Sequence, residues 1–147
     1  MRHEFIVDNR QDKKVLVMCL VGYKPDLWVK VFDRFIKYMD IDADVCLVSS
    51  GVYNKQLELL ALSNKWSYLM TKDNNLCLAQ NECIEHHPNA EYIFKVDEDM
   101  FVTEHSFSKL MESMQYLEEY SDYVPGAIVP LININATSLP SLLRFTD

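Results

Sequence analysis

Residues 92–102 read YIFKVDEDMFV, and the fold and the candidate site can both be inferred outward from this segment. Its first part is short and mostly apolar and follows the turn signal PNA at residues 88–90, so it predicts a buried strand. The strand ends at Asp97 and Asp99, which are separated by one residue. Open α/β sheets bind ligands beyond the carboxyl ends of their strands, where this pair falls. Two carboxylates at this spacing can share one divalent cation.

The rest of the chain alternates apolar runs with segments of helical periodicity. Further strands are expected at residues 14–21, 44–48, 66–70 and 127–132, and helices at residues 26–39, 54–63, 77–87 and after Thr103. This alternation predicts an α/β fold with a doubly wound, mostly parallel sheet of the Rossmann type. We expect a single domain over residues 1–147, with residues 1–12 as a loose lead-in and residues 133–147 as an irregular tail.

The composition limits the kinds of partner and the cellular compartment that we expect for this chain. The 147-residue chain is 49% hydrophobic and 24% charged, with a formal net charge of -8 and no basic stripe, so we expect no nucleic-acid partner. The most apolar run, residues 15–21, is too short for a transmembrane segment, and no secretory signal follows Met1. The four cysteines show neither a CxxC pair nor the spacing of a disulfide scaffold. A cytoplasmic location is therefore expected.

A lone D-x-D pattern is weak evidence, because it also occurs at Asp40/Asp42 and at Asp42/Asp44. Those pairs lie between an expected helix and the start of the next strand, at the end of the sheet opposite the ligand site. We interpret them as a solvated turn. Asp97 and Asp99 differ because they follow a strand.

Two other chemistries can be compared with the segment that follows Asp97. A calcium-binding EF-hand loop needs glycine at the sixth position and glutamate at the twelfth, but these positions hold Val102 and Ser108. A phosphatase with an aspartyl nucleophile expects a small or hydroxyl residue soon after the pair, whereas Met100 and Phe101 stand there. The EF-hand is excluded, and the phosphatase stays a minor alternative.

The neighbouring residues carry a resemblance to known enzymes. Residues 95–101 resemble the K-x-D-x-D-x-F segment of family 31 glycosyltransferases. Asn75, Ala79 and Asn81 precede them, much as an N-x-G-x-x-x-A-x-N region precedes the acidic motif of family 2 glycosyltransferases. Residues 21–25 sit where family 2 carries its first loop, against the nucleotide. The resemblance covers nearly the whole chain at low identity.

This resemblance implies a GT-A fold and a metal-dependent hexosyltransferase that moves a sugar from a UDP- or GDP-sugar to a carbohydrate or other hydroxyl acceptor. Asp99 would be the principal ligand of Mn²⁺ or Mg²⁺, and Asp97 would contact the metal or the ribose. The implied nucleotide-sugar contacts are Gly22, Tyr23, Ser49, Ser50, Asp73, Asn75, Asn81 and Asp97.

Several of these positions depart from the family 2 pattern. Ser49 and Ser50 stand where acidic residues usually read the base, and Cys77 replaces a glycine. Asp73 is therefore held as a candidate base contact, with a helix cap as the alternative.

Other side chains near the motif have competing interpretations. Lys95 shares a strand face with Asp97, so we expect a buried ion pair, with a phosphate contact as the alternative. Glu98 faces the other way if strand geometry persists, and is not expected to be a ligand. Cys83 with His86 or His87 has helical spacing compatible with zinc, a minor alternative because no matching pair occurs elsewhere.

An inverting transferase also needs a carboxylate that takes the acceptor proton. The later acidic residues do not provide a convincing base: Glu104, Glu112, Glu118, Glu119, Asp122 and Asp147. We therefore interpret the chain as the donor-binding half of a transferase, either a fragment or half of a site completed by a partner. The alternative from another class is a non-catalytic nucleotide-sugar-binding or partner-docking module.

Overall fold

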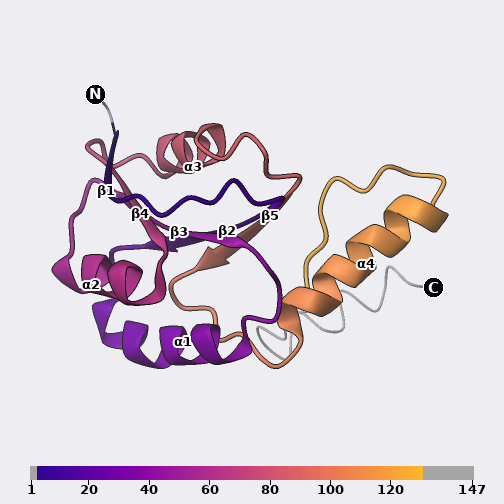
Figure 1. Ribbon diagram of the computed structural model, residues 1–147, viewed down its shortest axis with the longest axis horizontal. Helices are drawn as coiled ribbons and strands as arrows, with labels where there is room; N and C mark the ends of the chain where they lie inside the picture. Colours follow the sequence, from indigo (N-terminus) through magenta and orange to yellow (C-terminus); the bar gives the residue numbers. More distant parts are fainter. Residues whose placement is uncertain (1–2, 131–147) are drawn as a thin grey trace, which may run out of the picture. The chain divides into compact units, whose positions relative to one another are not determined.

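A computed structural model describes residues 3–130 of the chain and shows an α/β architecture (Figure 1). Its elements are, in order, β1 (His3–Val7), β2 (Val15–Val21), α1 (Pro25–Tyr38), β3 (Asp44–Ser50), α2 (Lys55–Asn64), β4 (Ser67–Thr71), α3 (Leu76–Glu85), β5 (Tyr92–Asp97) and α4 (Ser106–Tyr120). The chain divides into two compact units, Met1–His105 and Ser106–Asp147. The sheet and its three neighbouring helices belong to the first unit, and α4 belongs to the second.

The sheet has five strands in the order β1-β4-β3-β2-β5. Strands β2 to β5 are parallel to one another, and β1 runs antiparallel beside β4. The predicted mostly parallel α/β sheet is therefore confirmed. Successive strands β2, β3 and β4 extend to one side, whereas β5 returns to the other side of β2. Strand order thus reverses between β2 and β5, and such a reversal opens a crevice at the carboxyl ends of the strands.

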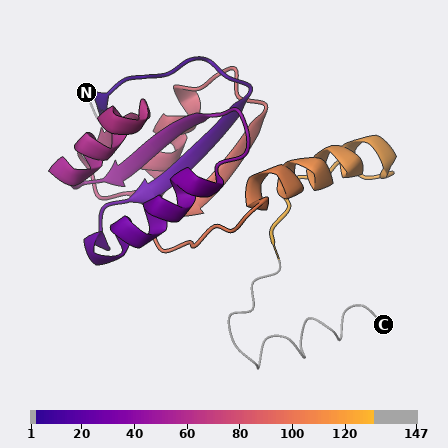
Figure 2. The same cartoon turned by 60° about the horizontal axis from the view of Figure 1, so that its bottom comes forward.

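Helices cover both faces of this sheet. In Figures 1 and 2, α1 and α2 lie on one face and α3 lies on the other. On the α3 face, Leu16, Met18 and Leu20 of β2 belong to one core cluster with Ala79 and Cys83. The alternate residues of β2 face α1 and α2 by the two-residue period of a strand. Burial on both faces explains why β2 is a continuous apolar run rather than an alternating one.

The amino-terminal strand β1 was not predicted, so the expected loose lead-in over residues 1–12 is wrong for His3–Val7. Phe5 lies opposite Leu69 of β4 and packs against the core cluster. The segment after β1 is also held. Asp44 accepts hydrogen bonds from the backbone N–H groups of Gln11 and Lys13, both at 3.0 Å. Asp44 is consequently buried, which corrects the expected solvated turn at this position.

The second unit contains α4, the helix expected after Thr103. Residues 127–130 form no strand, so the strand expected over residues 127–132 is wrong for these four positions. Residues 131–132 and the expected tail at 133–147 lie outside the described residues. None of the helices within residues 3–130 is both long enough and apolar enough to cross a membrane.

Candidate functional site

A crevice of about 380 Å³ opens at the point where the strand order reverses. Its walls come from the carboxyl ends of β2, β3 and β5 and from the loops that follow β2 and β4. The lining residues are Leu20, Val21, Tyr23, Lys24, Ser50, Asn74, Leu76, Asp97, Glu98 and Asp99. The structure therefore brings the acidic end of β5 together with the loop after β2, as the position of this reversal requires.

Asp97 and Asp99 both line the crevice, and each is paired with a lysine. Asp97 Oδ1 lies 2.9 Å from Lys95 Nζ, and Asp99 Oδ2 forms an ion pair with Lys24 Nζ. The hydrogen bond from Lys24 lowers the pKa of Asp99 below its ordinary value, so this carboxyl is ionised at neutral pH. Their side chains are 48% and 42% exposed, respectively, which leaves both carboxylates open to solvent.

These carboxylates fit a hard divalent cation. Carboxylate oxygens are the donors that Mg²⁺ and Mn²⁺ prefer, and both groups are accessible in one crevice. A bound cation would replace the lysine contacts. The expected ion pair between Lys95 and Asp97 is present, but it is about half exposed rather than buried, because Lys95 lies on the exposed side of β5.

Glu98 has a different role from its two neighbours. Its carboxylate is buried and accepts hydrogen bonds from the backbone N–H groups of Gly22, Tyr23 and Lys24, at 3.0–3.1 Å. The indole N–H of Trp28 donates to the same carboxylate at 2.7 Å. Successive backbone N–H groups form a concavity that binds anions, and here the anion is the protein's own glutamate. Glu98 therefore fastens the loop after β2 to the end of β5.

Gly22 occupies the tight turn of this loop. Its φ is +135°, and a Cβ built at this position would lie 2.8 Å from Cγ1 of Val52. Any larger residue would therefore be strained and would clash. The backbone N–H of Gly22 already donates to Glu98, so Gly22 contributes to the crevice by setting the path of the loop rather than by contacting a ligand.

Tyr23 connects the loop after β2 to the end of β3 and to the loop after β4, at the crevice. Its hydroxyl oxygen lies 2.5 Å from the carbonyl oxygen of Ser50 and 2.9 Å from the side-chain oxygen of Asn74. The residue is nevertheless 55% exposed. These contacts hold an accessible aromatic ring in a fixed place. Asn74 was not identified from the sequence, because its relevance depends on Tyr23 crossing between loops.

Ser49 and Ser50 lie on opposite faces of β3. The hydroxyl of Ser49 donates to the carbonyl of Val52 at 2.6 Å and lies 3.0 Å from the hydroxyl of Tyr68, in a fully buried position. Ser50 lines the crevice, and its hydroxyl donates to the carbonyl of Asp73 at 3.3 Å. Of the two serines, only Ser50 reaches the crevice.

The remaining sequence-predicted contacts follow β4. Asn75 is the N-cap of α3, because its side-chain oxygen accepts the N–H of Leu78 at 3.0 Å. The alternative of Asp73 as the cap is therefore wrong, and its side chain is exposed. Asn81 is exposed on α3 and is not among the residues that line the crevice.

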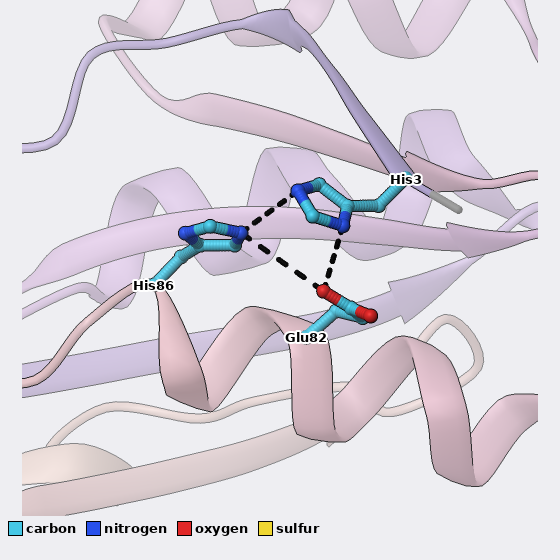
Figure 3. Close-up of side chains that lie close together, drawn as sticks. All are labelled: His3, Glu82 and His86. Carbon is cyan, nitrogen blue, oxygen red and sulfur yellow. Dashed lines mark hydrogen bonds and ion pairs between the residues drawn. The ribbon is translucent and has the colours of Figure 1, made fainter. Parts of the chain in front are cut away.

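A second polar cluster lies away from the carboxyl ends of β2 and β5. Within residues 3–130, three side chains that could hold a metal ion come together at one place, namely His3, Glu82 and His86 (Figure 3). The zinc alternative paired Cys83 with His86 or His87, and Cys83 Sγ lies 3.9 Å from Nδ1 of His87. Cys83 is fully buried in the core, and the ring of His86 is directed toward His3. The sequence signal for Glu82 and His86 was their i, i+4 spacing, but nothing local pointed to His3.

Comparison with known proteins gives no match: no family model, no curated protein and no solved structure is significantly similar to this chain.

Proposed function

We propose that the crevice binds a nucleoside diphosphate sugar and that the chain is the donor-binding domain of a metal-dependent glycosyltransferase with a doubly wound GT-A fold. The observation that carries the proposal is the position of Asp97 and Asp99, which are both accessible where the strand order reverses. A ligand crevice at this point is typical of open α/β sheets. Helices on both faces of the sheet agree with a doubly wound arrangement.

Asp99 and Asp97 would hold Mn²⁺ or Mg²⁺, which would offset the charge that develops on the leaving diphosphate. Lys24 can exchange its partner when the donor binds. In the free protein it neutralises Asp99, and a diphosphate in the crevice offers it a second anion. The loop that carries Lys24 is fixed by Glu98, so its ammonium starts from a defined position.

Tyr23 is the residue we assign to the nucleoside. Its ring is accessible and its hydroxyl is held by Ser50 and Asn74. Stacking of a base on an aromatic ring contributes about 1–3 kcal/mol and tolerates different bases. Ser50, the last residue of β3, and the exposed Asp73, in the loop after β4, are the residues we assign to contacts with the base or ribose.

A second candidate is a donor-binding module without catalysis. The observation that favours it is the set of carboxylates around the crevice. Among the described residues, the acidic side chains that line the crevice are those of Asp97, Glu98 and Asp99. The carboxylate of Glu98 already accepts hydrogen bonds from four N–H groups. No further described carboxylate is placed to take a proton from an acceptor.

Calorimetric titration with UDP- and GDP-sugars, with and without Mn²⁺, tests the proposed function. We expect Mn²⁺ to raise the affinity for one donor class by at least about tenfold, equivalent to 1.4 kcal/mol. Asp99→Asn should abolish that increase because it removes the charge of the principal ligand. Asp42→Asn is a matched control, since Asp42 belongs to another D-x-D pair and is exposed.

Affinity that is independent of metal, or equally metal-dependent in Asp99→Asn, would contradict the proposal. Donor hydrolysis by the wild-type chain would favour the transferase over the binding module. Metal-dependent binding without hydrolysis or transfer, with candidate acceptors present, would favour the module.

A further inference from the structure

The strand β1 and the helix α3 meet at a cluster of two histidines and one glutamate, independent of the crevice (Figure 3). His3 Nδ1 lies 2.7 Å from Glu82 Oε2, and His3 Nε2 lies 2.8 Å from His86 Nε2. His86 Nε2 is 4.0 Å from Glu82 Oε2. One ligand atom from each residue thus falls within 4.8 Å of the other two.

Hydrogen bonding within this cluster is incomplete at Nδ1 of His3. The contact between the two imidazole nitrogens at 2.8 Å needs one proton, which either ring can supply. If a neutral His3 supplies it, the lone pair on its Nδ1 faces the carboxylate of Glu82. If His86 supplies it, the N–H at Nδ1 of His3 faces that carboxylate, but this buried nitrogen has no aligned hydrogen-bond partner. A buried polar atom in this state is unfavourable, and a cation bound by the three side chains would replace this incomplete hydrogen bonding.

We propose that His3, Glu82 and His86 form a binding site for a zinc-type divalent cation. Two imidazole nitrogens and one carboxylate oxygen are a ligand set that binds Zn²⁺, with a further position left for water. Ligand atoms around a tetrahedral zinc lie roughly 3.3 Å apart, given zinc–nitrogen distances of about 2.0 Å. The separations of 2.8 Å and 4.0 Å lie on either side of this value.

The fold holds the three ligands in place from two sides. Glu82 lies on α3 and His86 is the C-cap of the same helix, four residues further on, so the two side chains lie on one side of the helix end. Their side chains and that of His3 are 16%, 34% and 21% exposed, which leaves access for an ion and excludes most of the solvent. The ring of Phe5 packs edge-on against His86, with centroids 5.4 Å apart.

The guanidinium of Arg10, which contacts the backbone of His86, does not oppose the site. Arg10 donates from Nη1 to the carbonyl of His86 at 3.0 Å, and its guanidinium also pairs with Asp8 at 2.7–2.8 Å. The charge of Arg10 is therefore offset locally. A metal at the cluster would fasten β1, which pairs only with β4, onto the helix on the same side of the sheet.

Titration with Zn²⁺ alone, and with Co²⁺ as an optical probe, tests this site. A Cys77→Ser background removes the exposed thiol, a competing soft ligand. We expect one equivalent of Co²⁺ to give the intense visible bands of four-coordinate cobalt and one equivalent of Zn²⁺ to displace it. Zn²⁺ should also raise the melting temperature, because it binds only the folded cluster.

Variants then assign the ligands. His86→Ala and Glu82→Gln should each lower the Zn²⁺ affinity by at least about 10–100-fold, the loss seen when even an outer-shell partner is removed. His105→Ala is the matched control, because His105 is 64% exposed and lies outside the cluster. Asp99→Asn should also leave zinc binding unchanged, which separates this site from the crevice.

Absence of the cobalt bands in the wild-type chain would overturn the proposal, as would Zn²⁺ affinity that His86→Ala leaves intact. If a variant fails to fold, histidine NMR of the wild-type chain decides. Zn²⁺ should shift the ring nitrogens of His3 and His86 and leave those of His105 in place. Shifts at His105 alone would show that the cluster is held by shared protons only.

Discussion

The crevice and the His3–Glu82–His86 cluster are built in opposite ways. The crevice takes its acidic groups from consecutive residues at the end of β5, and its other walls follow from where the neighbouring strands end. The cluster joins His3 to His86 across 83 positions of sequence. A motif of consecutive residues can be recognised in a single sequence, whereas a site made by strand pairing requires the pairing to be known.

Their donor atoms differ as well. The crevice offers carboxylate oxygens, which suit Mg²⁺ or Mn²⁺, while the cluster offers two nitrogens and one oxygen, which suit Zn²⁺. We therefore expect the two sites to select different metals and to respond independently to mutation.

The largest expected effect is that of Glu98→Ala. The substitution leaves three backbone N–H groups and the Trp28 indole without their buried acceptor, and each buried unsatisfied group costs about 1–3 kcal/mol. Because some of these donors will reach water, we expect a total loss of about 3 kcal/mol in the free energy of unfolding, measured with urea. Donor binding should be lost and zinc binding kept at temperatures where the variant is folded.

Glu104→Ala is the control for this change, since Glu104 is 76% exposed and should cost under about 0.5 kcal/mol. Equal stability of the Glu98 and Glu104 variants would show that Glu98 does not hold the loop.

Gly22→Ala should have the next largest effect. The alanine would be strained at φ +135° and its Cβ would approach Val52 to 2.8 Å, so we expect a loss of about 1–3 kcal/mol by thermal or urea unfolding. Donor affinity should fall with it, because the loop carries Tyr23 and Lys24. Gly126→Ala meets nothing within 4 Å and should be nearly neutral. A tolerated alanine at Gly22 would mean that the loop follows another path.

Lys24→Met should raise the affinity for Mn²⁺ alone and lower the affinity for the sugar nucleotide. Without nucleotide, Mn²⁺ no longer competes with the ammonium for Asp99, so its affinity should rise a few-fold, roughly the strength of a surface ion pair. With the donor present, the affinity for the sugar nucleotide should fall, because a phosphate partner is lost. Isothermal titration of both ligands measures the pair of effects.

Lys109→Met is the control, since Lys109 pairs with Glu112 on α4 in a similarly exposed bridge. If Lys24→Met lowers both affinities or neither, the proposed exchange of partners is wrong.

The smallest expected effect is a pH-dependent change in the free energy of unfolding at the Asp8–Arg10 ion pair, which lies beside His86. The hydrogen bond from Arg10 lowers the pKa of Asp8, so this pair stabilises the fold above the unfolded pKa of about 3.9 and the contribution is lost as pH falls through the lower folded value. Because the pair is partly exposed to solvent, Asp8→Asn should cost under about 1 kcal/mol at pH 7. The difference from wild type should vanish near pH 2, as measured by unfolding curves. A constant difference at every pH would contradict the ionic origin.

The parallel part of the fold could be predicted because each of its strands can be recognised from its own residues. The cores of β2 and β3 are uninterrupted apolar runs, and the segments between them carry helical spacing. The strand β1 could not be predicted in this way. It has only five residues, which include the polar His3 and Glu4, and it is stabilised as a strand by pairing with β4. The expected strand at residues 127–130 shows the reverse case, in which an apolar run forms no strand.

The candidate site was predictable to a similar extent. The position of Asp97 at the end of β5, beside the crevice, could be predicted from the sequence. The strand ends there and a turn follows, in which the N–H of Met100 donates to the carbonyl of Asp97 at 3.0 Å. The inward direction of Glu98 depends on that turn and on the loop after β2. Ser49 shares a strand face with Val45 and Leu47, opposite the face of Ser50, so that its distance from the crevice could be inferred from the two-residue period of the strand.

Crystals soaked with MnCl₂ and UDP, measured for anomalous scattering by manganese, test the central claim most directly. The account predicts an anomalous peak bound by Asp99 and the diphosphate at the carboxyl ends of β2 and β5, with Lys24 moved away from Asp99. UDP bound elsewhere, or a manganese peak only at His3, Glu82 and His86, would contradict it.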